Sequence, residues 1–305
     1  MTDSILRAVV DRLRANGATA ATVERVTVGD GVVMVELLAD GTAGDDPPRR
    51  LAGLAHRPPG PVPSATDRDV ETLLEWATGA VGPSPDGRED RDHGAIAVGV
   101  AALNALSAPF VDWQRGDPMA LLESDVETIT TVGLFRPAFR KFDDVEVRVI
   151  ERDPVDPASV SAPDGVAVST FEPGEAEVAM DGASVVFVTG SAFVYGGVER
   201  YLEAAPASAT VVLVGATASV LPGPAFDVGV DIVAGAAVVE PDRVREAIRQ
   251  GACGTDLHDA GVAKVYAVDG RPRGVRLDAT DDRSADRRDE RTATDRSRRP
   301  EDTNP

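Results

Sequence analysis

Two residues at the ends of neighbouring predicted strands have the spacing of a dinucleotide site. Gly133 follows an apolar run that begins at Thr128, and Glu151 ends the next such run, 18 residues later. In dinucleotide sites the glycine permits a tight turn and the acid binds a ribose hydroxyl. The fingerprint G-x-G-x-x-G is absent, however, so a pyrophosphate would meet Phe135 and Pro137 instead of bare backbone. We therefore do not expect NAD as a cofactor. The alternative to a dinucleotide site is that Gly133 only forms a tight turn in a Rossmann-like scaffold.

Two loops rich in small and hydroxyl-bearing residues follow later predicted strands. One contains Thr189, Gly190 and Ser191, and the other contains Gly215 and Thr217. Ligands of open α/β sheets bind at the carboxyl ends of strands, and backbone N–H groups at a helix N-terminus can bind an anion. We expect these five residues to contribute to a ligand site. The alternative is that their small size only lets the two loops pack closely.

Three side chains are candidate metal ligands. Glu151 offers a carboxylate that suits a hard cation, and hydroxyls of Thr189 and Thr217 could supplement it. Cys253 and His258 offer a soft thiol and an imidazole, but C-x4-H is not a recognised ligand spacing, and a structural loop after a helix is the alternative. The single cysteine excludes an intramolecular disulfide and a four-cysteine zinc site.

The remaining histidines and the lysines have no recognisable catalytic pattern. His56 ends a predicted strand and could face an interface or the solvent, and His93 is expected in solvent. No serine lies in a G-x-S-x-G turn, and neither Lys141 nor Lys264 follows the glycines of a phosphate-binding loop. A nucleophilic hydrolase and a P-loop enzyme are therefore not expected.

The charge of the chain restricts its partners and its compartment. There are 31 basic and 51 acidic residues, giving a net charge of −20, and only two of the basic residues are lysines. Such a surface repels nucleic acids and anionic lipids, so we expect neither as a partner. Abundant acidic residues with almost no lysine are typical of a halophilic protein. No uninterrupted apolar stretch reaches the roughly 18 residues that cross a bilayer, and the N-terminus does not resemble a signal peptide, which favours a cytoplasmic protein.

The elements that must position these residues change character along the chain. Residues 1–110 predict a small α+β domain: an amphipathic helix over 4–15, a hairpin of strands 23–28 and 32–38 around Gly29-Asp30-Gly31, a third strand over 51–56, and a buried helix over 94–106. Residues 111–124 form a predicted linker. In residues 125–275 strand-like runs alternate with short helices, which is typical of a doubly wound parallel sheet. Residues 278–305 are charged, lack an apolar run and are expected to be disordered.

Five segments, in order and spacing, resemble the heavy-metal chelation domain family of bacteria and archaea. They are GVAALNAL (Gly99–Leu106), TVGLFRPAFRKF (Thr131–Phe142), VIERDP (Val149–Pro154), GASVVFVTGSAFV (Gly182–Val194) and DVGVDIVAGAAVVEPDRV (Asp227–Val244). The resemblance covers about residues 1–268. It implies an α/β protein in which an N-terminal domain similar to that of enolases precedes a Rossmann-like domain, with the site in the cleft between them.

Matched to the family position by position, the polar and glycine candidates are Asn104, Gly133, Glu151, Thr189, Gly190 and Gly215. A side-chain amide that is buried on an apolar helix without hydrogen-bond partners lowers the stability by about 1–3 kcal/mol. The alternative to a ligand contact for Asn104 is therefore a hydrogen bond to the backbone of a neighbouring loop. Two loops depart from the family pattern. An asparagine is usual after Thr189-Gly190, where this chain has Phe193 to Tyr195, and Gly-Pro-Ser/Thr is usual where it has Gly215-Ala216-Thr217.

The resemblance implies binding of a divalent or heavy-metal ion, or of a small metal chelate, in the cleft between the domains. One alternative is an enzyme that acts on a nucleotide-like substrate through an altered Rossmann site. A second is a non-catalytic structural or partner-binding protein. The sequence leaves homo-oligomerisation open.

Overall fold

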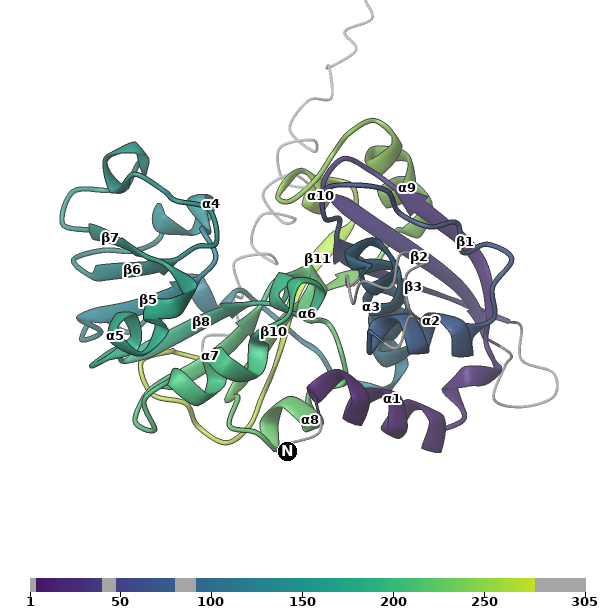
Figure 1. The fold of residues 1–305 in the computed structure, drawn as a ribbon, viewed down its shortest axis with the longest axis horizontal. Coiled ribbons are helices and arrows are strands. Elements are labelled where there is room, and N and C mark those ends of the chain that lie inside the picture. The colour runs from purple at the N-terminus through teal and green to yellow at the C-terminus, as the bar shows by residue number, and fades with distance from the viewer. Residues whose placement is uncertain (1–3, 40–47, 80–91, 278–305) are drawn as a thin grey trace, which may run out of the picture.

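The N-terminal part of the computed structural model is built on a three-stranded antiparallel sheet, in the order β1-β2-β3 (Figure 1). The structure describes residues 4–39, 48–79 and 92–277. The hairpin closes where predicted, with the Gly29 N–H donating to the Val32 carbonyl at 2.9 Å. The elements of this unit are α1 (Ile5–Ala15), β1 (Thr22–Val28), β2 (Val32–Ala39), β3 (Arg49–His56), α2 (Val70–Ala77) and α3 (His93–Ser107).

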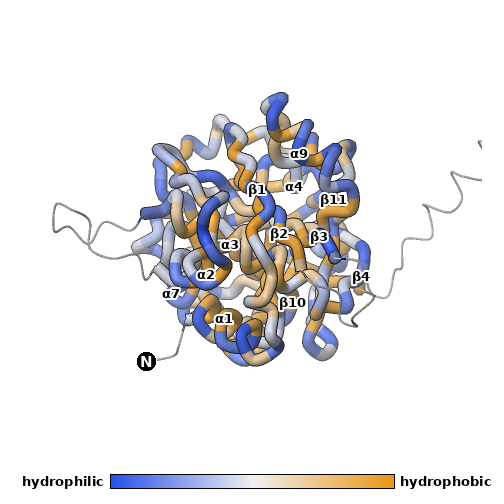
Figure 2. Tube along the Cα trace, turned by 90° about the vertical axis from the view of Figure 1, so that its right-hand side faces the viewer, coloured by the Kyte–Doolittle hydropathy of each residue, from blue (hydrophilic) through white to orange (hydrophobic). Residues whose placement is uncertain are grey.

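Helix α3 is the centre of this unit, and 14 of its 15 residues are buried. Glycines allow its close contacts: a Cβ at Gly53 would lie 2.2 Å from the Ala101 carbonyl oxygen, and one at Gly99 would lie 2.3 Å from the Ala77 nitrogen. Residues His93–Phe110 are long and apolar enough to span a membrane, but 78% of that segment is buried inside the protein. Its apolarity is thus explained by the core, in which hydrophobic segments gather around α3 and β2 (Figure 2).

The second unit is built on an eight-stranded sheet in the order β4-β11-β10-β9-β8-β5-β6-β7. The six parallel strands, β10-β9-β8-β5-β6-β7, reproduce the strand order of dinucleotide-binding folds, which reverses between β5 and β8. This confirms the predicted α/β class with a doubly wound sheet after a small α+β unit. The strands are β4 (Gln114–Arg115), β5 (Thr128–Val132), β6 (Glu146–Ile150), β7 (Ala167–Phe171), β8 (Val185–Thr189), β9 (Thr210–Val214), β10 (Ile232–Val238) and β11 (Val262–Val268).

Short helices connect these strands. They are α4 (Arg136–Phe139), α5 (Ala176–Met180), α6 (Ser191–Tyr195), α7 (Val198–Ala204), α8 (Gly223–Phe226), α9 (Pro241–Arg249) and α10 (Asp256–Asp259). The apolar run that begins at Thr128 predicts a strand over 128–135, but the strand ends at Val132, because Gly133 turns the chain with φ 101°. The predicted tail over 278–305 lies outside the described residues. The sequence also predicts a polar loop over 41–50 and an insert over 82–92, and most of each lies outside the described residues.

Three strands differ from the prediction. Strand β4 lies within the predicted linker over 111–124 and pairs with β11 at the edge of the large sheet. Strand β7 has no continuous apolar run, because it is an edge strand with exposed or half-buried residues, so the sequence pattern did not indicate it. Strand β11 pairs antiparallel to β10 and not parallel. The reason is the connection: α9 does not cross the large sheet but packs on β1 of the small sheet, so the chain returns beside β10 in the opposite direction (Figure 1).

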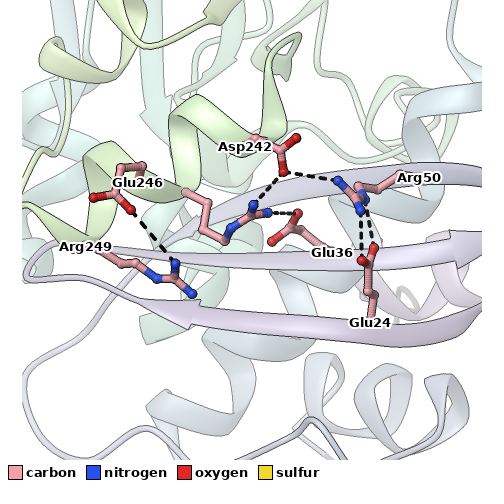
Figure 3. Close-up of polar contacts among 7 residues, drawn as sticks. Glu24, Glu36, Arg50, Asp242, Glu246 and Arg249 are labelled. Carbon is pink, nitrogen blue, oxygen red and sulfur yellow. Dashed lines mark hydrogen bonds and ion pairs between the residues drawn. The ribbon is translucent and has the colours of Figure 1, made fainter.

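A network of ion pairs attaches α9 to the small sheet (Figure 3). Arg245 of α9 donates to the buried carboxylate of Glu36 on β2 at 2.6 Å and also binds Asp242 at 2.5 Å. Asp242 in turn contacts Arg50 on β3 at 3.2 Å, and Arg50 binds Glu24 on β1 at 2.8 Å. The small sheet therefore lies between α3 on one face and α9 on the other. The largest hydrophobic cluster includes residues from both units, and the division at residues 110 and 125 stays a prediction.

Candidate functional site

A cavity of about 350 Å³ lies between the two units, at the carboxyl end of β9. Its walls come from β2 and β3 of the small sheet, from β9 to β11, from the loop after β5, and from α10. The lining is mainly apolar, with Leu54, Phe135 and Val265 as examples. This position agrees with the general rule for ligand sites in open α/β sheets.

Two of the predicted loop residues, Gly215 and Thr217, line the cavity directly. Gly215 has φ 109°, a backbone conformation that favours glycine. The Thr217 hydroxyl accepts a hydrogen bond from the His56 backbone N–H at 2.8 Å, which ties the loop after β9 to the end of β3. The loop that departs from the family pattern is therefore held in place and borders the cavity.

Asn104 of α3 also fixes the loop after β9, through hydrogen bonds to its backbone. Its Nδ2 donates to the carbonyls of Leu54 at 2.7 Å, Ala216 at 3.1 Å and Thr217 at 3.3 Å. Its Oδ1 is buried and has no partner among the described residues. The side chain is not among those that line the cavity, so these bonds support the loop-fixing alternative for Asn104.

The predicted residues at the reversal of strand order form a second group, which lies outside the cavity lining. A Cβ on Gly133 would lie 3.2 Å from Thr189, and one on Gly190 would lie 2.5 Å from the Ala218 nitrogen. The Thr189 and Ser191 hydroxyls lie 3.1 Å apart. These contacts bring the loops after β5, β8 and β9 together, and they fit the packing alternative stated for the small residues.

Glu151 belongs to this second group. Its carboxylate accepts the Leu134 backbone N–H at 2.6 Å and the Arg152 backbone N–H at 3.3 Å, which fixes the turn after Gly133. We expect Glu151→Gln to lower the free energy of unfolding by about 1 kcal/mol, because a charge-assisted bond becomes a neutral one. Affinity for a cavity ligand should stay unchanged, as measured by calorimetric titration. A tenfold loss of affinity with unchanged stability would instead place Glu151 in the ligand site.

Cys253 and His258 are not equivalent. Cys253 is exposed, whereas His258 lines the cavity. The His258 Nδ1 lies 2.9 Å from the Val262 carbonyl oxygen, which can only accept, so Nδ1 donates this bond. In the neutral imidazole, Nε2 is then left as an acceptor. Within the described ranges, no group of three or more His, Cys, Asp or Glu side chains is arranged to hold a metal ion.

An aromatic and basic cluster, not predicted from the sequence, lies beside the cavity. The Tyr195 hydroxyl lies 2.9 Å from His56 Nε2, the Arg152 guanidinium lies 3.4 Å from the centre of the Tyr195 ring, and His93 packs edge-on against that ring at 5.4 Å. His56 also lines the cavity. Both histidines are half-buried, so the expectation of a solvated His93 is wrong. The only sequence signal was Tyr195 itself, at a position where the family pattern differs.

The titration of His56 should make stability depend on pH. Burial, with a smaller contribution from the Arg152 charge, lowers the pKa of His56 below 6.5. As the pH falls, the unfolded chain therefore binds this proton before the folded protein does. The contribution of neutral His56 to the free energy of unfolding is complete above about pH 6.5 and is lost as the pH falls towards the lowered pKa. We expect the native protein to lose more stability between about pH 7.5 and 5.5 than His56→Asn. Parallel denaturation profiles of the two proteins across that range would contradict this.

The only two lysines of the chain also meet at the cavity. Lys141 and Lys264 both donate to the same oxygen, Oδ2 of Asp117, the latter at 2.5 Å, and all three residues line the cavity. Burial by itself would raise the pKa of Asp117, but the hydrogen bonds from the two ammonium groups outweigh it and hold that pKa below its usual range. No sequence motif indicates a role for these lysines, since neither follows the glycines of a phosphate-binding loop. Their rarity was the signal that could have singled them out.

Comparisons with known proteins agree on one family. Residues 117–267 match the family model DUF364, described as "Putative heavy-metal chelation". A DUF364 protein of unknown function from Pyrococcus horikoshii is 20% identical, with 87% of this chain and 100% of that chain covered and a TM-score of 0.65. A second, from Desulfitobacterium hafniense DCB-2, is 15% identical, with 87% and 98% covered and a TM-score of 0.60. At these identities the two structures establish the fold alone. No curated protein matches the chain.

Proposed function

Because residues 117–267 of this chain belong to the DUF364 family, we propose that the protein binds a heavy metal, and that it binds the metal as a small organic chelate in the cavity between its two units. The family description supports metal binding. The observation that supports a chelate is the character of the cavity, which is lined mainly by apolar side chains.

The donor groups disfavour a bare ion. Structural metal sites need about three or four side-chain ligands at short range, and the described part of the chain has no such group of His, Cys, Asp or Glu. The Glu151 carboxylate already accepts two backbone N–H groups. His258 lines the cavity, and Nε2 of its neutral imidazole could contact a metal whose other ligands come from the chelator.

The size and lining of the cavity suit an organic molecule. A volume of about 350 Å³ lies within the range of small-molecule sites, which are mostly apolar with a few polar groups that fix orientation. Here those groups include Thr217, His258 and the two lysines. The enzyme alternative receives no comparable support, because Glu151, its ribose-binding candidate, bonds the turn after β5.

Thermal unfolding with matched ligands tests the proposal. Ni²⁺, Zn²⁺ and Cd²⁺ are added alone and as complexes with citrate or nitrilotriacetate. We expect at least one chelate to raise the melting temperature as its concentration exceeds Kd, and the bare ions to have little effect. The variant Ala236→Trp, which fills the cavity from β10, should abolish the response, whereas Val178→Trp on an exposed position of α5 should not. Equal stabilisation by the bare ions, or an unchanged response of Ala236→Trp, would contradict the proposal.

A further inference from the structure

We propose that Lys141 and Lys264 form an anion subsite in the cavity, and that this subsite selects ligands that carry a carboxylate or phosphate group. The inference deepens the proposed function and rests on it, because it names the chemical class of the chelator. Its starting point is that a chain with 31 basic residues keeps only two lysines, and both line the same cavity.

The geometry leaves donors free for a ligand. Each ammonium group has three N–H donors, and its hydrogen bond among the described residues goes to Asp117. The lysine side chains are 33% and 41% exposed, whereas Asp117 is 19% exposed. Two positive charges on one carboxylate leave a net positive cluster that still faces the cavity.

Asp117 explains how the two cations can stay together. Two ammonium groups that contact the same oxygen lie close together and repel each other, and the negative charge of the shared Asp117 carboxylate offsets that repulsion. Asp117 is itself fixed, since its other oxygen accepts the Met119 backbone N–H at 3.2 Å. The lysines come from separate segments, Lys141 from the loop after α4 and Lys264 from β11, so the subsite forms only in the folded protein.

The charge of the rest of the molecule makes this cluster selective. With a net charge of −20, the protein surface repels anions. An anion that enters a largely apolar cavity loses hydration and must find cations there. An anionic ligand would therefore bind at this cluster and not elsewhere on the surface.

A purely structural role is the competing explanation, because Asp117 joins three segments. The ligand-binding role and the structural role predict different effects of single lysine variants on the melting temperature and on ligand preference. In Lys141→Gln or Lys264→Gln, Asp117 keeps the other lysine, so the fold should persist with a melting temperature close to that of the native protein. Under the structural explanation these variants lose stability but do not change ligand preference.

The test is calorimetric titration of the full chain with metal-free citrate, with its neutral trimethyl ester, with inorganic phosphate and with the Ni²⁺–citrate complex. We expect citrate or phosphate to bind and the ester not to bind. Each lysine-to-glutamine variant should weaken binding by about tenfold or more, and the corresponding arginine variants by much less. Arg12→Gln, which removes a positive charge from an exposed ion pair on α1, is the matched control and should bind as the native protein does.

Each outcome separates this inference from the proposed function. Binding of Ni²⁺–citrate that is equally strong in the lysine-to-glutamine variants would overturn the anion subsite and leave the chelate function standing. Lysine-dependent binding of metal-free citrate or phosphate, with no binding of any chelate, would support the subsite and overturn the chelate function. Equal binding of the ester and of citrate would overturn the subsite.

Discussion

Replacement of Arg245 by alanine is expected to lower the free energy of unfolding by about 3–5 kcal/mol, the cost of removing one partner from a buried ion pair. Glu36 is fully buried on β2, and its Oε1 accepts from Arg245 at 2.6 Å, while its Oε2 has no partner among the described residues. Without Arg245, the carboxylate would be left in the core with no countercharge. Urea denaturation measures the loss.

Two comparison variants isolate the buried pair. Arg243→Ala, on the same helix, removes a side chain that is 60% exposed and pairs with Glu240, so its cost should be within about 1 kcal/mol. The double variant Glu36→Leu with Arg245→Met should recover much of the loss, because apolar residues of similar volume often replace buried ion pairs without penalty. Equal costs for Arg245→Ala and Arg243→Ala would contradict this interpretation of the network.

Gly53→Ala should be at least as damaging, although it adds a single methyl group. The new Cβ would lie 2.2 Å from the Ala101 carbonyl oxygen and 2.3 Å from the Ala105 nitrogen, both in the backbone of α3. Backbone atoms cannot rotate away, so β3 and α3 must separate. Overpacking of a core costs about 1–3 kcal/mol when side chains can adjust, and we expect this variant to exceed that range.

Gly174→Ala is the matched control for Gly53→Ala. No heavy atom lies within 4 Å of a Cβ at Gly174, so this substitution should change the melting temperature very little. Circular dichroism during heating compares the two variants. A Gly53→Ala protein that melts with the Gly174→Ala control would show that α3 does not pack on β3 as closely as described.

Elements with a local pattern were predictable from the sequence. The hairpin of β1 and β2 follows from β-branched runs around Gly29-Asp30-Gly31, and the buried helix α3 follows from a segment that is apolar on nearly all sides. The central parallel strands were recognised because both faces of each are covered, which requires continuous apolar runs. The direction of β11 was not predictable, because it depends on where α9 packs, a contact between segments about 200 residues apart.

The candidate site was predictable only in part, for the same physical reason. Loop residues Gly215 and Thr217 border the cavity because strand ends place them there. The contacts of Tyr195 with His56 and with Arg152 join three distant segments, and no sequence spacing encodes them. The positions of the two lysines around Asp117 likewise depend on the complete fold.

The location and form of the bound metal test the account most directly. Crystals of the protein grown with Ni²⁺–citrate would be measured at the nickel absorption edge. We expect one anomalous peak in the cavity beside Gly215, Thr217 and His258, surrounded by density for the organic ligand. A peak at Glu151 or Cys253, or a nickel ion held in the cavity by protein side chains alone, would contradict binding of the metal as a chelate.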